Sequence, residues 1–143
     1  MKPVILIPTY NESIAIVELL NSLSILHNTR DFDLVVLDDN SPDKTADIVD
    51  SMNLPWVSVL RRPGKAGLGA AYRAGFAHVL PMKKYSKIVT MDADGSHRVA
   101  DLPAMLDATD APISITLGTR WMPGGSVVNW PKSRQLLSKS GTK

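Results

Sequence analysis

Residues 3–12 read PVILIPTYNE, a short apolar run that is ended by a proline and followed by polar side chains. An apolar run of this length, bounded by turn-forming residues, predicts a buried β-strand. Asn11 is the expected N-cap of a helix. Beyond it, apolar residues recur at helical spacing, namely Ile16, Leu19, Leu20, Leu23 and Leu26. The stretch therefore predicts a strand that leads directly into a helix.

Strands and helices continue to alternate along the chain. Further strands are expected at residues 32–37, 57–60, 87–91 and 113–117. Helices are expected through 48–52, at 70–80, at 101–108 and from about Arg134 onward. Such alternation is typical of right-handed crossovers and of a mainly parallel sheet with helices on both faces. The sequence thus predicts an α/β fold.

The composition suits one globular domain over residues 1–143, with 44% hydrophobic and 21% charged residues. A net charge of +2 is too small to indicate nucleic-acid binding, and the lack of cysteine excludes disulfides and thiolate chemistry. The N-terminus does not resemble a signal peptide, and no apolar run approaches the roughly 20 residues that cross a bilayer. Because the last expected helix is so short, we expect the chain to be the front part of a longer protein, without its acceptor-side part.

Three of the predicted strands end in polar clusters, which read TYNE at 9–12, DDNS at 38–41 and DAD at 92–94. Ligands of open parallel sheets bind beyond the carboxyl ends of the strands, so we expect the three clusters to meet at one edge. Acidic groups that meet there repel one another unless a cation lies between them.

Asp92 and Asp94 carry the sharpest chemical signal. Two carboxylates on either side of a small residue, just after a strand, suit a hard cation such as Mg²⁺ or Mn²⁺. A helix N-cap or a solvated turn is the alternative interpretation. At Asp38 and Asp39, one carboxylate is expected to hold the turn, and the other to accept hydrogen bonds from a nucleobase or a ribose.

The loop RRPGKAGLG at 61–69 is a candidate phosphate-binding loop, because glycines before a helix expose backbone N–H groups to an anion. Its spacing does not match a Walker A motif, and a flexible basic turn is equally compatible with it. A lone histidine such as His97 is more often structural than catalytic. His27 and His78 lie in helical segments, where we expect them to face solvent.

Taken together and in order, these motifs resemble those of family 2 glycosyltransferases of the dolichyl- or polyprenyl-phosphate mannosyltransferase type. The matching stretches are PTYNE at 8–12, DDNS at 38–41, GKAGLG at 64–69, MDAD at 91–94, and GTRW at 118–121 with Gly124, Gly125, Trp130 and Arg134. The resemblance covers nearly the whole chain. The chain departs from the family pattern at Gly95, where leucine is usual, at Arg98, where proline is common, and at Trp121, where tyrosine is usual.

The resemblance implies a GT-A, Rossmann-like fold and an inverting transfer. It implies that Asp92 and Asp94 hold Mg²⁺ or Mn²⁺ and the diphosphate, with Ser96 close to the metal. It also implies that Arg120 and Arg134 bind the phosphate of a lipid acceptor and, with Asp94, carry the transfer. The residues implied around the nucleotide are Pro8, Tyr10, Glu12, Asp39 and Lys65.

The expected function is transfer of mannose from GDP-mannose to a polyprenyl phosphate. We expect the protein to work at the cytoplasmic face of a membrane, in peripheral contact with it or through a separate membrane partner. One alternative is a donor of the UDP-sugar type, as in a polyprenyl-phosphate glucosyltransferase. Another is a non-catalytic nucleotide-binding fragment. A dinucleotide oxidoreductase is disfavoured, because no G-x-G-x-x-G motif follows the first strand.

Overall fold

The computed structural model describes residues 1–108, 115–119 and 131–140. The chain forms two compact units, Met1–Leu102 and Pro103–Lys143. The first unit contains a sheet of four parallel strands in the order β3-β2-β1-β4. These strands are β1 (Lys2–Thr9), β2 (Asp33–Asp38), β3 (Val57–Arg61) and β4 (Tyr85–Thr90). The parallel sheet that the sequence predicts is therefore confirmed.

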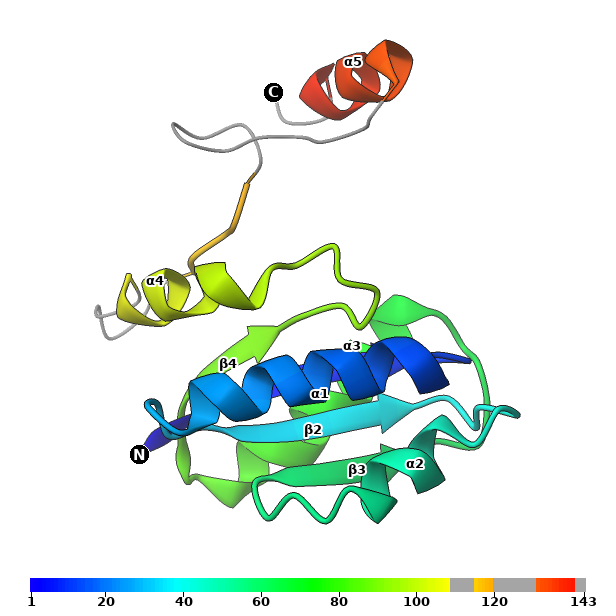
Figure 1. Cartoon of the computed structure of the whole chain (residues 1–143), viewed down its shortest axis with the longest axis vertical. Helices are drawn as coiled ribbons and strands as arrows, with labels where there is room; N and C mark the ends of the chain where they lie inside the picture. Colours follow the sequence, from blue (N-terminus) through cyan, green and yellow to red (C-terminus); the bar gives the residue numbers. More distant parts are fainter. Residues whose placement is uncertain (109–114, 120–130, 141–143) are drawn as a thin grey trace. The chain divides into compact units, whose positions relative to one another are not determined.

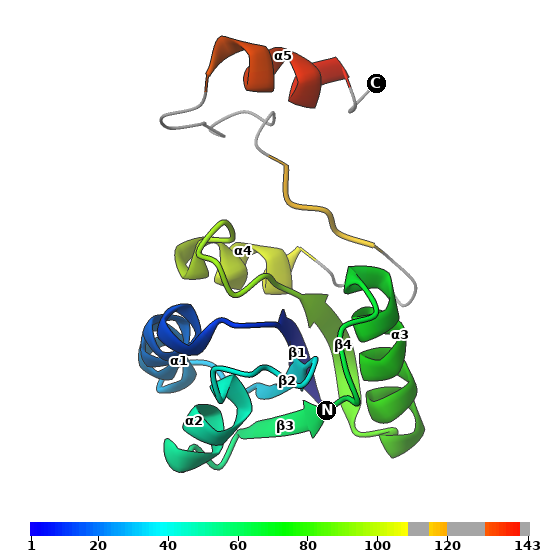
Figure 2. The ribbon, with the colours of Figure 1, turned by 90° about the vertical axis from the view of Figure 1, so that its right-hand side faces the viewer.

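Three helices connect the strands and cover both faces of the sheet. They are α1 (Ser13–His27), α2 (Thr45–Ser51) and α3 (Leu68–Val79), and Figures 1 and 2 show α1 and α2 on one face and α3 on the other. Two short 3₁₀ helices, η1 (Leu80–Met82) and η2 (Val99–Asp101), precede β4 and α4 (Leu102–Asp107) respectively. Helices on opposite faces are what right-handed crossovers between parallel strands produce.

The strand register brings the carboxyl ends of the strands to one edge of the sheet. Thr9 lies opposite Asp38, and Asp38 lies opposite Arg61. On the other side of β1, Leu6 lies opposite Thr90, the last residue of β4. The end of β4 therefore lies beside the carboxyl-terminal half of β1. The polar clusters that follow β1, β2 and β4 therefore begin at the same edge, as the sequence predicts.

Close packing of α3 against the sheet depends on Gly75. One face of the sheet packs Val4, Leu6, Val35 and Leu37 into a buried cluster with Val79 of α3. A Cβ atom on Gly75 would lie 2.8 Å from Leu37 Cδ1 and 3.0 Å from Leu6 Cδ1, closer than carbon atoms approach. The missing side chain thus lets the helix backbone approach the strands.

The start of α1 differs from the sequence prediction. Asn11 does not cap the helix: it adopts a left-handed conformation with a φ of 60°, and its N–H donates to Ser41 Oγ. The helix begins at Ser13, whose N–H donates to Asp43 Oδ2 at 3.0 Å. The cap therefore comes from a residue 30 positions further along the chain.

His27 is not a solvent-facing residue, in contrast to the prediction, whereas His78 is exposed as expected. The imidazole of His27 stacks on Trp56 with ring centres 4.5 Å apart and meets the edge of Phe32 at 5.1 Å. Its Nε2 atom is buried without a hydrogen-bond partner among the described residues. The aromatic neighbours come from other segments, so helical spacing alone does not reveal them.

The second unit contains α5 (Lys132–Ser140), close to the helix expected from Arg134. The sequence predicts a strand at 113–117, but residues 115–117, which the structure describes, have no regular secondary structure. A strand needs a hydrogen-bonded neighbour, and no partner strand is found for it in the described ranges. Residues 113 and 114 lie outside the described part. No described helix is long and apolar enough to cross a membrane.

Candidate functional site

The carboxyl edge of the sheet has a polar framework built around Asp38. The carboxylate is buried and accepts hydrogen bonds from Thr9 Oγ1 at 3.0 Å, from Ser41 Oγ at 2.6 Å and from the Ser41 backbone N–H at 2.9 Å. These bonds join the end of β1 to the turn after β2. Because its oxygens are engaged within the protein, Asp38 holds the turn, as expected for one of the two carboxylates.

Asp39 is buried beside Asp38 but has a different partner. Its Oδ1 atom forms an ion pair with the guanidinium of Arg62, and the side chains of Asp39 and Arg62 are 7% and 11% exposed. The backbone supports this pair, since Arg62 N–H donates to Asp38 O and Asp39 N–H donates to Thr9 O. A buried carboxylate needs such a partner, because an unpaired charge at this depth is strongly destabilising. Asp39 is expected to accept hydrogen bonds from a nucleotide, and Arg62, 23 positions further along the chain, is a partner that no local sequence pattern indicates.

Asp92 follows β4 and is held by residues from two other segments. Tyr72 of α3 donates its hydroxyl to Asp92 Oδ1 at 3.3 Å. The backbone N–H of Asp92 donates to Nδ1 of His97 at 3.0 Å, and His97 Nε2 lies 4.0 Å from Asp92 Oδ2. His97 therefore closes the loop between residues 92 and 97, a structural role that matches the more common behaviour of a lone histidine.

Asp94 lies at an exposed turn after the buried Ala93. The Ser96 backbone N–H donates to Asp94 Oδ1 at 2.9 Å. This hydrogen bond lowers the pKa of Asp94, with a smaller contribution from the side chain of Ser96. Gly95 occupies the turn with a φ of 75°, a backbone conformation that residues other than glycine rarely adopt. Asp94 is consequently ionised at neutral pH and accessible.

The donor set at Asp92 and Asp94 fits a hard divalent cation. Neither carboxylate is paired with a lysine or arginine in the part of the chain that the structure describes. The same part contains no group of three or more acidic, histidine or cysteine side chains that could bind a metal alone. Mg²⁺ is commonly held by one or two carboxylates together with the phosphates of a substrate. Two carboxylates just after a strand end match that arrangement.

The basic loop after β3 lies against the end of β1. Lys65 Nζ lies 4.3 Å from the centre of the Tyr10 ring, a cation–π contact between two residues assigned to nucleotide binding. Gly67 caps α3 with a φ of 86°, and a Cβ atom on it would meet no atom within 4 Å. The loop therefore leaves open space in front of the first turn of α3.

Pro8 and Glu12 flank Tyr10 in the sequence. Pro8 is half-buried in β1, and Glu12 immediately precedes α1, with its N–H bonded to Thr45 Oγ1 at 3.1 Å. The residues assigned to the nucleotide thus come from the ends of β1 and β2 and from the loop before α3. Arg134 is exposed on α5, in the second unit, and Arg120 lies outside the described residues.

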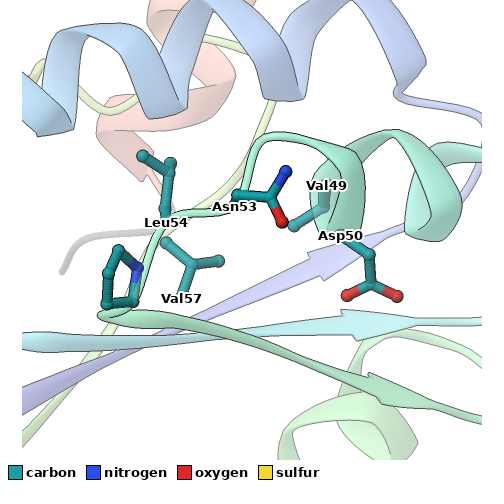
Figure 3. A pocket seen from close by; sticks show the side chains of 6 residues that line it. Val49, Asp50, Asn53, Leu54 and Val57 are labelled. Atoms are coloured by element: carbon teal, nitrogen blue, oxygen red, sulfur yellow. The ribbon is translucent and has the colours of Figure 1, made fainter.

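The shallow pocket in Figure 3 is not part of this arrangement. It has a volume of about 330 Å³ and lies where α2 ends and β3 begins, which is the amino end of that strand. Its lining combines apolar residues with Asn53 and Asp50, and Asp50 pairs with Arg61 at 2.7 Å. The chemistry expected of the chain lies at the opposite end of the strands.

The family is established by a comparison with family models. The model described as "Glycosyl transferase family 2" matches residues 4–143. The chain belongs to this family. Among curated proteins, this family 2 glycosyltransferase chain is 42% identical to a polyprenol monophosphomannose synthase of Mycolicibacterium smegmatis, over 97% of the chain and 52% of that protein. It is also 42% identical to an undecaprenyl-phosphate mannosyltransferase of Micrococcus luteus, over 99% of the chain and 58% of that protein.

A dolichol-phosphate mannosyltransferase of Pyrococcus furiosus is 34% identical over 97% of the family 2 chain and 39% of its own length. The chain therefore spans about half the length of the curated relatives it matches. These relatives confirm the resemblance that the ordered motifs indicate.

Solved structures confirm the GT-A-like fold of the family 2 chain. The mannosyltransferase PcManGT of Pyrobaculum calidifontis, in complex with GDP-Man and Mn²⁺, superposes with a TM-score of 0.60 at 24% identity, over 72% of this chain and 30% of that one. TarS 1–349 of S. aureus superposes with a TM-score of 0.55 at 29% identity, over 76% of this chain and 33% of that one.

Proposed function

We propose that this chain binds the sugar nucleotide in an enzyme that transfers mannose from GDP-mannose to a polyprenyl phosphate. The observation that carries the proposal is the pair Asp92 and Asp94, two carboxylates at the carboxyl edge of the sheet that have no lysine or arginine partner among the described residues. Support for the substrates comes from the names of the relatives that are 42% identical. Peripheral contact with the cytoplasmic face of a membrane follows from the lipid acceptor, either directly or through a membrane partner.

In this proposal Asp92 and Asp94 hold Mg²⁺ or Mn²⁺ together with the diphosphate of the donor, and Ser96 fixes Asp94 through its N–H. When bound, such an ion supplies positive charge that stabilises the leaving diphosphate. The chain's own contribution is to orient both carboxylates and to keep Asp94 ionised. The lowered pKa of Asp94, caused first by the hydrogen bond from Ser96, serves that purpose.

The nucleoside is assigned to Tyr10, Lys65 and Asp39, with Pro8 and Glu12 shaping the end of β1. Lys65 is an exposed cation with a flexible side chain and can exchange the Tyr10 ring for a phosphate oxygen. Asp39 is held by Arg62 through Oδ1, which leaves Oδ2 to accept from a nucleobase N–H or a ribose hydroxyl. Open backbone N–H groups before α3 favour the negative charge of the diphosphate.

The acceptor phosphate is assigned to Arg120 and Arg134, because guanidinium groups bind phosphate with two parallel hydrogen bonds. A phosphate monoester is already anionic near neutral pH, so its attack on the sugar requires no strong general base. In the transfer, a phosphate oxygen of the acceptor forms a bond to the anomeric carbon as the bond to the diphosphate breaks. GDP leaves, and the configuration is inverted.

The first test is a donor-binding titration with the Asp94→Ala chain. Wild type is expected to bind GDP more tightly when Mn²⁺ or Mg²⁺ is present, and Asp94→Ala is expected to lose this cation-dependent gain. Asp31→Ala is the matched control, because Asp31 is exposed and pairs with Lys2 at the start of β1, at the other end of the strands from the site. Unchanged cation dependence in Asp94→Ala would refute the metal assignment.

A competition experiment distinguishes a guanine from a uracil nucleotide as the sugar donor. We expect GDP-mannose to displace a bound guanine nucleotide at lower concentration than UDP-glucose does. The reverse order would favour a UDP-sugar transferase. Binding of GDP and cation without transfer to polyprenyl phosphate would support the non-catalytic alternative.

A further inference from the structure

Tyr72 connects two parts of the site that are far apart in the sequence. It lies on α3, five residues after Gly67, which caps the helix behind the Lys65 loop. Its hydroxyl reaches Asp92, which follows β4 and lies 20 positions further along the chain. One helix therefore begins at the loop assigned to the diphosphate and contacts a carboxylate assigned to the cation.

The packing of Tyr72 fixes the direction of its hydroxyl. The ring is packed against the buried cluster of Val4, Leu6, Val35 and Leu37, and it stacks with Phe76 at 6.4 Å between ring centres. A ring held in this way has little freedom, so the position of the hydroxyl is set by the core rather than by solvent. The hydrogen bond to Asp92 Oδ1 measures 3.3 Å.

The phenol of Tyr72 offers Asp92 a neutral hydrogen-bond donor. Asp92 is 39% exposed and has no lysine or arginine partner within the described residues, so a neutral donor orients the carboxylate without cancelling its charge. An arginine at the same place would compete with a cation.

We propose that Tyr72 is a positioning residue that orients Asp92 for the divalent cation and ties that carboxylate to the helix behind the Lys65 loop. The inference rests on the proposed function. Residues that hydrogen-bond to metal ligands restrict their rotation, and replacing them commonly weakens metal binding 10–100-fold. Because Tyr72 belongs to α3, its hydrogen bond links Asp92 to the helix that begins behind the Lys65 loop. Binding of the cation at Asp92 is therefore expected to strengthen binding of the nucleotide at the loop, and binding of the nucleotide to strengthen binding of the cation by the same factor.

The test is the Tyr72→Phe chain, which keeps the ring and removes the hydroxyl. The apparent dissociation constant for Mn²⁺ is measured from the cation dependence of GDP binding. We expect it to rise by about 10-fold, the lower end of the range for such residues. GDP binding measured in EDTA, without cation, is expected to change by less than about 2-fold, which is under roughly 0.5 kcal/mol, because the hydroxyl donates to Asp92, outside the Lys65 loop.

Tyr85→Phe is the matched control. Tyr85 also donates to a carboxylate, Asp33 Oδ2 at 3.0 Å, but it begins β4 at the other end of the strand. This change is expected to leave the Mn²⁺ dependence of GDP binding as in wild type. An equal loss in both variants would indicate a general effect on the fold and would contradict a role specific to Tyr72.

The possible outcomes separate this inference from the proposed function. If wild type binds GDP without any dependence on Mn²⁺, the proposed function fails and the role of Tyr72 fails with it. If wild type depends on Mn²⁺ and Tyr72→Phe shows the same dependence, only the role of Tyr72 is overturned. A Tyr72→Phe chain that no longer unfolds cooperatively would assign the hydroxyl to the fold and would also overturn it.

Discussion

Asp38, Asp39 and Asp43 lie within six residues of one another and have three different partners. Asp38 holds the turn after β2, and Asp39 pairs with Arg62. Asp43 caps two helices at once, since its Oδ2 accepts from Ser13 N–H at 3.0 Å and its Oδ1 accepts from Thr45 N–H at 3.0 Å. The chemistry of a single aspartate is thus decided by the groups that reach it.

We expect Asp43→Ala to lower the free energy of unfolding by about 1–2 kcal/mol, because removing a helix cap leaves backbone N–H groups without a partner. The measurement is urea unfolding followed by circular dichroism at neutral pH. Asp31→Ala is the control: its side chain is 70% exposed and its partner in the described part of the chain is Lys2, a surface ion pair that contributes little to stability. Equal stability of the two variants would contradict the capping role.

Among the helices, α3 depends most visibly on one small residue. Gly75→Val would place atoms where Leu37 Cδ1 and Leu6 Cδ1 already lie, so we expect the free energy of unfolding to fall by about 1–3 kcal/mol. Gly69→Ala is the control on the same helix, because its Cβ would meet no atom within 4 Å. Alanine is a better helix former than glycine, so this variant should be as stable as wild type or more so. Thermal unfolding compares the two, and a Gly75→Val chain as stable as wild type would exclude close packing here.

For the first unit as a whole, stability is expected to decrease at acidic pH. Burial alone would raise the pKa of Asp33, but hydrogen bonds from Lys2, Lys84 and Tyr85 outweigh it and lower the pKa below 3.8. Hydrogen bonds from Thr45 and Ser13 likewise outweigh burial and lower the pKa of Asp43. A folded-state pKa below the unfolded value means that these groups stabilise the fold above pH 3.8 and that this contribution is lost as the pH falls through the folded-state values.

The measurement is the unfolding temperature between pH 7 and pH 2.5. We expect it to fall most steeply below about pH 4, and to fall less steeply in Asp33→Asn, which cannot titrate. An identical pH profile in the variant would show that Asp33 does not contribute to the acid sensitivity.

The sequence by itself determined the parallel α/β architecture and the position of the candidate site. Apolar runs and helical spacing are local patterns, and each polar cluster follows its strand directly, so Asp92, Asp94 and Asp39 could be located without coordinates. The ordered motifs also indicated family 2, which the comparisons confirm.

Only the tertiary structure decided which side chains pair with those residues. Arg62 meets Asp39 across 23 positions, and Tyr72 meets Asp92 across 20, and neither pairing has a local pattern. The same applies to His27, which is covered by Trp56, and to the start of α1, which is capped by Asp43 rather than Asn11. The physical reason is that periodicity along the chain records which face of an element is buried, whereas partners are set by strand register and by how closely each helix approaches the sheet.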